Sequence, residues 1–329
     1  MKRTLFFTFL LLAALSLTTV AAAQVEIEWV KAYDASLGEY SEGIAVDSQG
    51  NIYVSIVPLG QLRKISGRTG AETILYQFPA GTGVAGLAVD AANNVYAGVV
   101  SGDPAIHGVW QIDRRGHGTH LPGSEAIGMP PNGLAFDPSG NLWVTDSWVP
   151  GTEPPNAQGS VWRIRPGGEA ELWYRDVDTL GGLGNIPGYG PIGANGIAYY
   201  HRALYVANTE RGHIVRIPVL PHGGPGQPEV RWADPDLVMI DGITMNAIGS
   251  IFAAIIGQDK IVAICGITGQ LAVLAEGDPI DGPASVTFGA ASDRMTTLYF
   301  TNYAVLSGDE AQPGILKMNL NWPPWADNK

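Results

Sequence analysis

The stretch PPNGLAFDPSGNLWVTDS (residues 130–147) has the pattern of a β-hairpin. An apolar run leads into the turn cluster DPSGN (residues 137–141), and a second apolar run follows at residues 142–145. Asn132 stands just before the glycine of the first run, where asparagine is common as a turn residue. Whether Asn132 does more depends on what occupies the same place wherever the hairpin repeats.

The hairpin occurs six times along the chain, with four steps of 43–47 residues and one of 63 residues between copies. The copies are SEGIAVDSQGNIYVS (41–55), VAGLAVDAANNVYAG (84–98), PNGLAFDPSGNLWVT (131–145), ANGIAYYHRALYVAN (194–208), IDGITMNAIGSIFAA (240–254) and PASVTFGAASDRMTTLYFT (283–301). A period of about 40–50 residues is typical of the four-stranded blade of a β-propeller. We therefore predict an all-β fold, a six-bladed β-propeller of four-stranded blades with a central tunnel.

Two further features of the predicted propeller are the strands near the two ends of the chain and two long insertions. VEIEWVKAY (25–33) and GILKMNL (314–320) both read as strands, and we expect them to complete one blade together and cover its open edge. The Gly/Pro-rich insertions at residues 147–159 and 178–193 are long for hairpin loops. We expect the second to lie over one end of the tunnel, with a plain surface elaboration as the alternative.

The N-terminal residues 1–23 have the pattern of a secretory signal peptide. The cations Lys2 and Arg3 precede an apolar run that ends in small residues, and we expect cleavage before Gln24. The alternative is a retained N-terminal anchor. We expect a single propeller domain over residues 24–329, periplasmic or secreted, with no membrane span after cleavage.

Charge and cysteine content exclude several classes of function. The formal charge is −12, and loss of the two signal-peptide cations takes it to about −14, which argues against nucleic acid and against anionic membranes as partners. The single cysteine, Cys265, lies in an apolar run and cannot form an intramolecular disulfide; we expect it to be buried. No nucleophile elbow, P-loop or dinucleotide fingerprint is found. The expected partner is a small-molecule substrate, and the oligomeric state stays open.

One position of the repeat falls next to the axis of the predicted ring. It is occupied by Glu42, Ala85, Asn132, Asn195, Asp241 and Ala284. A turn position would also show Ser, Thr, Gly and Pro, whereas four of these six residues carry a side-chain oxygen of the kind that binds hard cations. Carboxylates and amides that meet on an axis are costly unless a cation pairs them.

An oxygen-only set suits Ca²⁺ above zinc, copper or iron, with another divalent ion as the alternative. We therefore predict that the metal ligands are Glu42, Asn132, Asn195 and Asp241. The competing interpretation is a solvated polar tunnel mouth without an ion.

A second ring of candidates follows from the hairpin, because antiparallel strands return to the end at which they started. The second strands end in Ser55, Asp146 with Ser147, Asn208 with Thr209, and Asn302 with Tyr303, and Trp148 and Tyr189 come from the insertions. We predict that Asp146, Asn208, Trp148 and Tyr189 contact substrate and that the other strand-end residues support the site. We also expect Tyr200 to join Trp148 and Tyr189 in an apolar wall, with inter-blade core as the alternative for these aromatics. The alternative role for Asp146 and Asn208 is that of strand-end and turn-capping residues.

The chain resembles the regucalcin/gluconolactonase (senescence marker protein-like) family of six-bladed propellers, kin to diisopropyl fluorophosphatase, paraoxonase and strictosidine synthase. The matching phrases are EGIAVD, NGLAFDPSGNLWVTD, ANGIAYYHRALYVANTERGHIVRIP, DGITM and GPASVTFG…LYFTN. The resemblance implies a tunnel calcium held by a Glu, two Asn and an Asp, which correspond to the four residues above. It also implies that Asp241 is the catalytic residue, as base or nucleophile.

The resemblance implies an exported calcium-dependent hydrolase that opens a lactone or related ester. Sugar lactonases of this family carry an Arg and an Asp near the third-blade Asn, where this chain has Pro130 and Gly133. That departure indicates a less polar substrate than a sugar acid lactone. Two alternatives are a non-enzymatic propeller that binds protein or carbohydrate, and a non-hydrolytic enzyme like strictosidine synthase.

Overall fold

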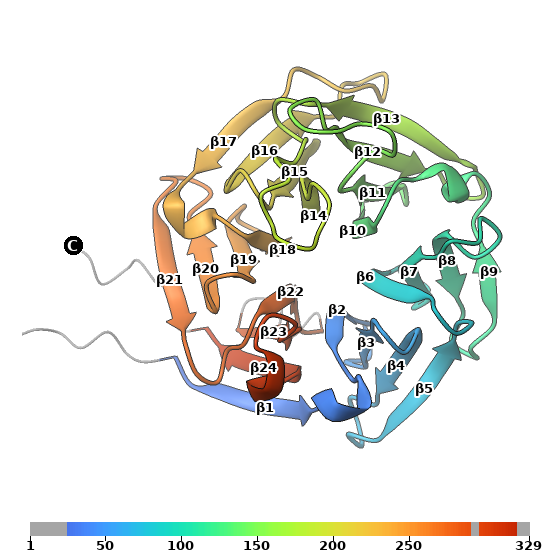
Figure 1. Cartoon of the computed structure of the whole chain (residues 1–329), viewed down its shortest axis with the longest axis vertical. Helices are drawn as coiled ribbons and strands as arrows, with labels where there is room; N and C mark the ends of the chain where they lie inside the picture. Colours follow the sequence, from blue (N-terminus) through green and yellow to red (C-terminus); the bar gives the residue numbers. More distant parts are fainter. Residues whose placement is uncertain (1–24, 291–295, 321–329) are drawn as a thin grey trace, which may run out of the picture.

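A computed structural model describes residues 25–290 and 296–320. These residues form six four-stranded sheets arranged around a central axis, as Figure 1 shows. The predicted six-bladed propeller is thereby confirmed. The expected signal peptide at residues 1–23 lies outside the described residues. Within the described part of the chain, no helix is both long and apolar enough to cross a membrane.

Five blades are each built from four consecutive strands. Blade one has β2 (Ser41–Val46), β3 (Ile52–Ile56), β4 (Gln61–Ile65) and β5 (Glu72–Gln77). Blade two has β6 (Gly83–Val89), β7 (Val95–Val100), β8 (Gly108–Ile112) and β9 (Gly118–His120). Blade three has β10 (Pro131–Phe136), β11 (Leu142–Asp146), β12 (Gly159–Ile164) and β13 (Ala170–Asp176). Blade four has β14 (Ala194–Tyr200), β15 (Ala203–Asn208), β16 (His213–Pro218) and β17 (Glu229–Ala233), and blade five has β18 (Ile240–Met245), β19 (Ile251–Ile255), β20 (Lys260–Ile264) and β21 (Leu271–Glu276).

The sixth blade joins the two ends of the described chain. It contains β22 (Pro283–Phe288), β23 (Thr297–Asn302), β24 (Gly314–Asn319) and, at its outer edge, β1 (Ile27–Ala32). β1 pairs antiparallel with β24, with Ile27 opposite Met318, which confirms the predicted closure. Four short 3₁₀ helices interrupt the loops: η1 (Ala35–Leu37), η2 (Ser124–Ala126), η3 (Pro235–Leu237) and η4 (Gly308–Glu310).

The core lies between the blades. All five residues of β3 are buried, whereas the outer strand β5 has only intermediate and exposed positions. Inner strands are covered on both faces because each blade stacks on the next, and Trp143 of blade three shares a cluster with Leu204 of blade four. Cys265 is buried, as expected.

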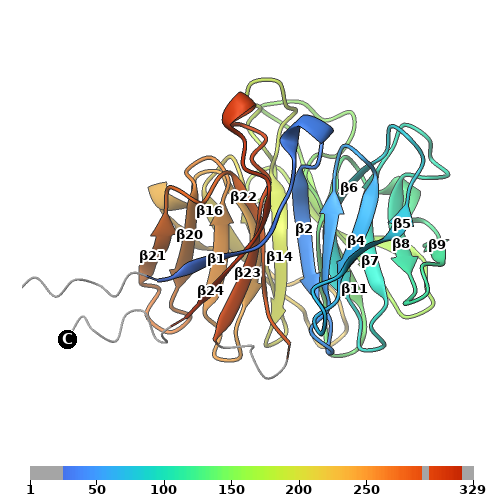
Figure 2. The ribbon, with the colours of Figure 1, turned by 90° about the horizontal axis from the view of Figure 1, so that it is seen from below.

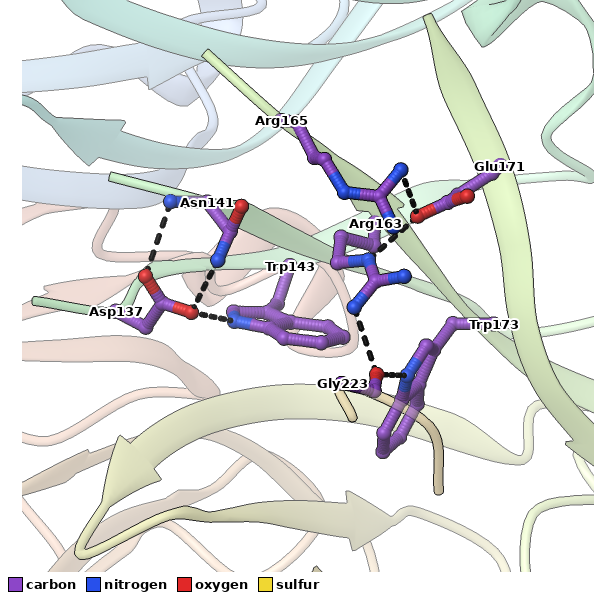
Figure 3. A network of polar contacts seen from close by, with 8 residues as sticks. All are labelled: Asp137, Asn141, Trp143, Arg163, Arg165, Glu171, Trp173 and Gly223. Carbon is purple, nitrogen blue, oxygen red and sulfur yellow. Dashed lines mark hydrogen bonds and ion pairs between the residues drawn. The ribbon is translucent and has the colours of Figure 1, made fainter. Parts of the chain in front are cut away.

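Aspartates fix the hairpin turns at the end of the blades opposite the insertions. In blade three the Asp137 carboxylate accepts hydrogen bonds from the Asn141 backbone N–H (3.0 Å), the Asn141 side chain (2.7 Å) and Trp143 Nε1 (3.1 Å), as Figure 3 shows. The same arrangement recurs around Asp47 and Asp90, where a tyrosine replaces the tryptophan. In blades one to three the D-x-x-x-N-x-aromatic pattern therefore fixes the register of the hairpin.

Blade three is also tied to blade four at its outer edge. Arg163 pairs with Glu171 (2.5 Å), and both Arg163 Nη1 and Trp173 Nε1 donate to the Gly223 carbonyl (2.7 and 2.8 Å) (Figure 3). In the side view of Figure 2, η1 and η4 lie together with the long loops on the side of the ring where the inner strands begin. That side carries the candidate site.

Candidate functional site

Every inner strand contains a β-bulge at the repeat position predicted to face the axis. In blade three, Pro131 pairs with Asp146 but Leu134 pairs with Val144, so three steps on β10 match two on β11. The other five blades shift register at the same place. A bulge places an extra residue in one strand and re-aims its side chain. The six bulges therefore turn Glu42 and its equivalents away from the regular alternation of the sheet.

Glycine after the bulge residue lets neighbouring inner strands approach closely. A Cβ on Gly133 would lie 2.5 Å from the carbonyl oxygen of Asn195, and one on Gly196 would lie 2.4 Å from that of Asp241. No side chain fits in that space. The backbones of successive blades are thus packed directly against each other, which brings the bulge residues together.

Glu42, Asn132, Asn195 and Asp241 come together as predicted. All four line two cavities: an axial tunnel of about 380 Å³ between the inner strands, and an outer pocket of about 430 Å³ beneath the long loops. Each of the four is at most 9% exposed. They therefore form the boundary between tunnel and pocket, and we call them the axial set.

The two carboxylates of the axial set lie in an environment that disfavours their charge. Burial raises the pKa of Glu42 well above its usual range, and the nearby Asp241 carboxylate raises it further. Burial also raises the pKa of Asp241 to about 7, although a hydrogen bond from Asn195 acts in the opposite direction. Without a positive charge nearby, these groups weaken the folded state at neutral pH.

The two amides of the axial set are oriented by hydroxyl groups. Asn195 Nδ2 donates to Thr209 Oγ1 (2.9 Å), and Asn132 Nδ2 donates to Ser147 Oγ (3.3 Å). The Ser147 hydroxyl itself donates to the carbonyl of Ala194 (2.7 Å), so it can serve Asn132 only as an acceptor. Because each NH₂ group donates to a hydroxyl, the amide oxygens are available to a ligand at the site.

Two oxygens of the axial set have no hydrogen-bond partner. They are Glu42 Oε2 and Asn195 Oδ1, both fully buried. Among the described residues no group of three or more His, Cys, Asp or Glu side chains is placed to hold a metal ion. The axial set, with two carboxylates and two amide oxygens, is instead of the mixed oxygen type that suits a hard divalent cation. The unpaired oxygens and the disfavoured carboxylates fit such an ion.

Asp146 and Asn208, predicted to contact substrate, do not line either cavity. The Asp146 carboxylate accepts hydrogen bonds from Ser160 Oγ (2.9 Å) and Trp148 N (3.1 Å), and Asn208 Nδ2 donates to the carbonyls of Thr179 (3.0 Å) and Gly181 (3.2 Å). Asp146 thus ties the start of the loop after β11 to β12, and Asn208 holds the insertion at residues 178–193. The contacts to the axial set come from the next residue in each blade, Ser147 and Thr209.

Trp148 and Tyr189 do line the outer pocket, whereas Tyr200 does not. Tyr200 lies at the β14–β15 turn, where its ring stacks on His201 and its hydroxyl donates to Ala247. The expectation that it joins an apolar wall at the site was therefore wrong. Tyr200 lies at the end of β14 far from Asn195, in the repeat position that Asp137 occupies in blade three.

Tyr303 belongs to the second ring expected from the sequence, whereas Glu210 was missed by sequence reasoning. Tyr303 lines the pocket beside the axial set; burial raises its pKa, with further contributions from Glu42, Tyr189 and Asp241, so its phenol stays protonated. Glu210 accepts three backbone hydrogen bonds from the insertion at residues 178–193, at Leu183 (2.8 Å), Asn185 (2.9 Å) and Ile192 (2.6 Å). Its position directly after a second-strand end was the available signal.

The fold and this site define a class: a six-bladed propeller with an oxygen-lined centre where axis and pocket meet. The chain belongs to the SMP-30/gluconolactonase/LRE-like family, whose model matches residues 109–304. This confirms the resemblance seen in the sequence. No curated protein matches the sequence.

Solved structures agree with the architecture. A luciferin-regenerating enzyme superposes with a TM-score of 0.66 at 14% identity, covering 91% of this chain and 96% of its own. A gluconolactonase from Xanthomonas campestris superposes with a TM-score of 0.66 at 20% identity, with 91% of each chain covered. The calcium-binding protein regucalcin from Agrobacterium tumefaciens superposes with a TM-score of 0.61 at 18% identity, covering 85% of this chain and 90% of its own. At these identities the likeness establishes the shared fold.

Proposed function

We propose that this chain is an exported, calcium-dependent hydrolase that opens a lactone or a related ester. The observation that carries the proposal is the axial set: four buried oxygen-bearing side chains, with two oxygens unpaired, at the floor of a pocket. Family membership and the gluconolactonase and regucalcin structures support the same activity and the same ion.

In this proposal Glu42, Asn132, Asn195 and Asp241 hold the cation, and Ser147 and Thr209 keep the two amide oxygens turned toward it. A bound divalent cation supplies Lewis-acid polarisation of a carbonyl oxygen. Asp241 either takes the proton of the attacking water or attacks the carbonyl carbon itself. The protonated phenol of Tyr303 is a hydrogen-bond donor beside the reacting oxygen.

The test combines metal analysis, thermal melts and turnover. Calcium should bind with a stoichiometry of about one and raise the melting temperature, and a chelator should reverse the rise because the ion binds only the folded state. A panel of lactones and esters, followed with a pH indicator, should show calcium-dependent turnover. Asp241→Asn should lose that turnover by at least about 100-fold while keeping the fold.

The exposed Asp309 offers the matched control, since Asp309→Asn makes the same change away from the axial set. Full turnover in Asp241→Asn, or turnover indifferent to calcium and chelator, would contradict the proposal. Reaction in ¹⁸O-labelled water separates the two roles of Asp241, because a nucleophilic carboxylate acquires the label after repeated turnovers.

Export rests on residues 1–23, which precede the described chain. The measurement is the intact mass of the protein recovered from culture medium or periplasm of an expressing bacterium. The expected mature chain begins at Gln24. Recovery of the full-length chain in the membrane fraction would instead support the anchor.

A further inference from the structure

The outer pocket differs sharply between floor and wall. Its polar floor is the axial set together with Thr209. All six blades line the pocket, and its apolar wall comes from five of them and from the loop at residues 178–193. The wall includes Val57, Val100, Met129, Ile186, Met239 and Leu306. Among the described residues that line it there is no Lys, Arg or His. The pocket is therefore polar only where the reaction would take place.

The apolar side chains extend to the rim of the pocket. Met129 and Tyr189 are each 46% exposed and Leu306 is 53% exposed, although all three line the pocket. Large apolar side chains that surround a cavity while facing solvent mark a surface that is covered when a ligand binds.

The loop at residues 178–193, which forms part of the pocket wall, is held in place by specific contacts. Glu210 holds both ends of the segment from Leu183 to Ile192 through charge-assisted hydrogen bonds. Between them, Gly190 packs on the Trp148 ring so tightly that a Cβ would lie 2.7 Å from Trp148 Cε3. The tryptophan is in turn fixed by its Nε1 donating to the Thr152 carbonyl (2.5 Å). The apolar wall is thus a preformed part of the site.

We infer that the substrate is an uncharged carbonyl compound with an apolar body, namely a lactone or ester that carries alkyl or aryl groups. This inference rests on the proposed function for the reacting group. A polyhydroxylated sugar lactone would bury hydroxyl groups against Val57, Met239 and Leu306, where they lose their hydrogen bonds to water without replacement. A free carboxylate on the ligand would meet no cationic side chain. A volume of about 430 Å³ accommodates a lactone with a medium-length alkyl chain.

The experiment is a chain-length series of δ-lactones, from the unsubstituted ring to a ring with a long alkyl group, compared with gluconolactone. Each buried methylene should raise kcat/KM by about fourfold until the pocket is full. Competition against the neutral probe Nile red measures binding of the same series without turnover. Leu306→Asp should weaken this chain-length dependence, and Ile267→Asp, at an 82% exposed isoleucine outside the pocket, should leave it unchanged.

The two proposals fail in different ways. If the alkyl lactones displace Nile red with rising affinity but none is hydrolysed, the inference of an apolar ligand is supported and the proposed hydrolase activity is contradicted. If lactones are hydrolysed with no dependence on chain length, or gluconolactone is preferred, the proposed hydrolase activity is supported and the inference about its substrate is overturned.

Discussion

Glu42 and Asp241, from blades one and five, place two buried carboxylates close enough that the charge of Asp241 adds to burial in raising the pKa of Glu42. The blade between them contributes Ala284, whose side chain is too short to separate the charges. Such a pair is stable only with a proton or a cation between its members. The arrangement is therefore costly in the absence of a ligand, which supports the proposed cation.

Replacing Glu42 by Gln should have opposite effects with and without calcium. In metal-free protein, removal of a buried charge should raise the free energy of unfolding by about 1 kcal/mol or more. With calcium, loss of a charged ligand should weaken binding at least about tenfold. Urea titrations with and without calcium measure both, with Glu125→Gln at an exposed site as control. A Glu42→Gln protein that is less stable without metal would contradict this account.

Replacing Tyr303 by Phe should lower kcat while leaving the fold intact, because it removes only the phenolic hydroxyl group beside the two carboxylates and keeps the ring. Loss of a donor to a developing negative charge lowers kcat on the order of 100-fold. The control is Tyr40→Phe, since Tyr40 packs edge-on against Tyr303 (6.5 Å between ring centroids) but does not line the pocket. Equal kinetics for the two variants would remove the Tyr303 hydroxyl from the mechanism.

Replacing Glu210 by Gln should release the loop at residues 178–193. The amide has one acceptor oxygen in place of two, and its NH₂ group faces backbone N–H donors at Leu183, Asn185 or Ile192. Amide hydrogen exchange at these residues should accelerate while exchange in the inner strands stays unchanged. KM for apolar substrates should rise more than kcat falls. Unchanged exchange in the loop would show that Glu210 does not hold it.

Replacing Gly133 by Ala should destabilise the whole propeller, because the new Cβ meets the Asn195 carbonyl oxygen at 2.5 Å. Such overpacking costs about 1–3 kcal/mol. Calcium affinity should fall as well, since Asn195 is displaced. Gly102→Ala is the matched control, as nothing lies within 4 Å of its Cβ position. A neutral Gly133→Ala would mean that the inner strands can move apart.

Below about pH 6.5, His213 should lower the stability of the protein, whereas the raised pKa values of Glu42 and Asp241 act in the opposite direction. Burial lowers the pKa of His213 below its usual 6.5, and its Nε2 lies 2.8 Å from the Thr179 carbonyl. Below pH 6.5 the unfolded chain takes up a proton that the folded His213 does not, so unfolding is favoured. His213→Gln, measured by urea titration between pH 7.5 and 5.5, should remove this contribution, so that stability at pH 5.5 relative to pH 7.5 is higher than in the unchanged protein. The exposed His222, replaced by Gln, is the control, and a slope unchanged in His213→Gln would exclude the buried histidine as a cause.

The repeat predicted that the four residues of the axial set lie close together, because equivalent positions on a ring are neighbours whatever their separation in sequence. Asn132 and Asn195 are 63 residues apart, yet both line the same pocket. The closure of the last blade by β1 and β24 followed from the same reasoning, since an open ring would expose a strand edge.

The bulges could not be predicted in this way. Strict alternation along a strand assigns Ser147 and Asp146 to opposite faces but does not reveal an extra residue in the partner strand. The bulge at Asn132 shifts the pairing, so the hydroxyl of Ser147 meets the amide and Asp146 turns to Ser160 and the loop backbone. The sequence placed Asp146 and Ser147 together at this strand end but did not resolve which of the two contacts the axial set.

The shared sixth blade also sets the order in which this molecule can be completed during synthesis. Thr301 Oγ1 donates to the Glu42 carbonyl (2.5 Å), and Ser41 Oγ donates to the carbonyls of Asn302 and Gly314 (2.9 and 3.1 Å). Glu42 is therefore held by residues of blade six, which are synthesised after the strands of the other five blades. Blades one to five can assemble as the nascent chain emerges, but Glu42 acquires its final surroundings only when translation has passed β24.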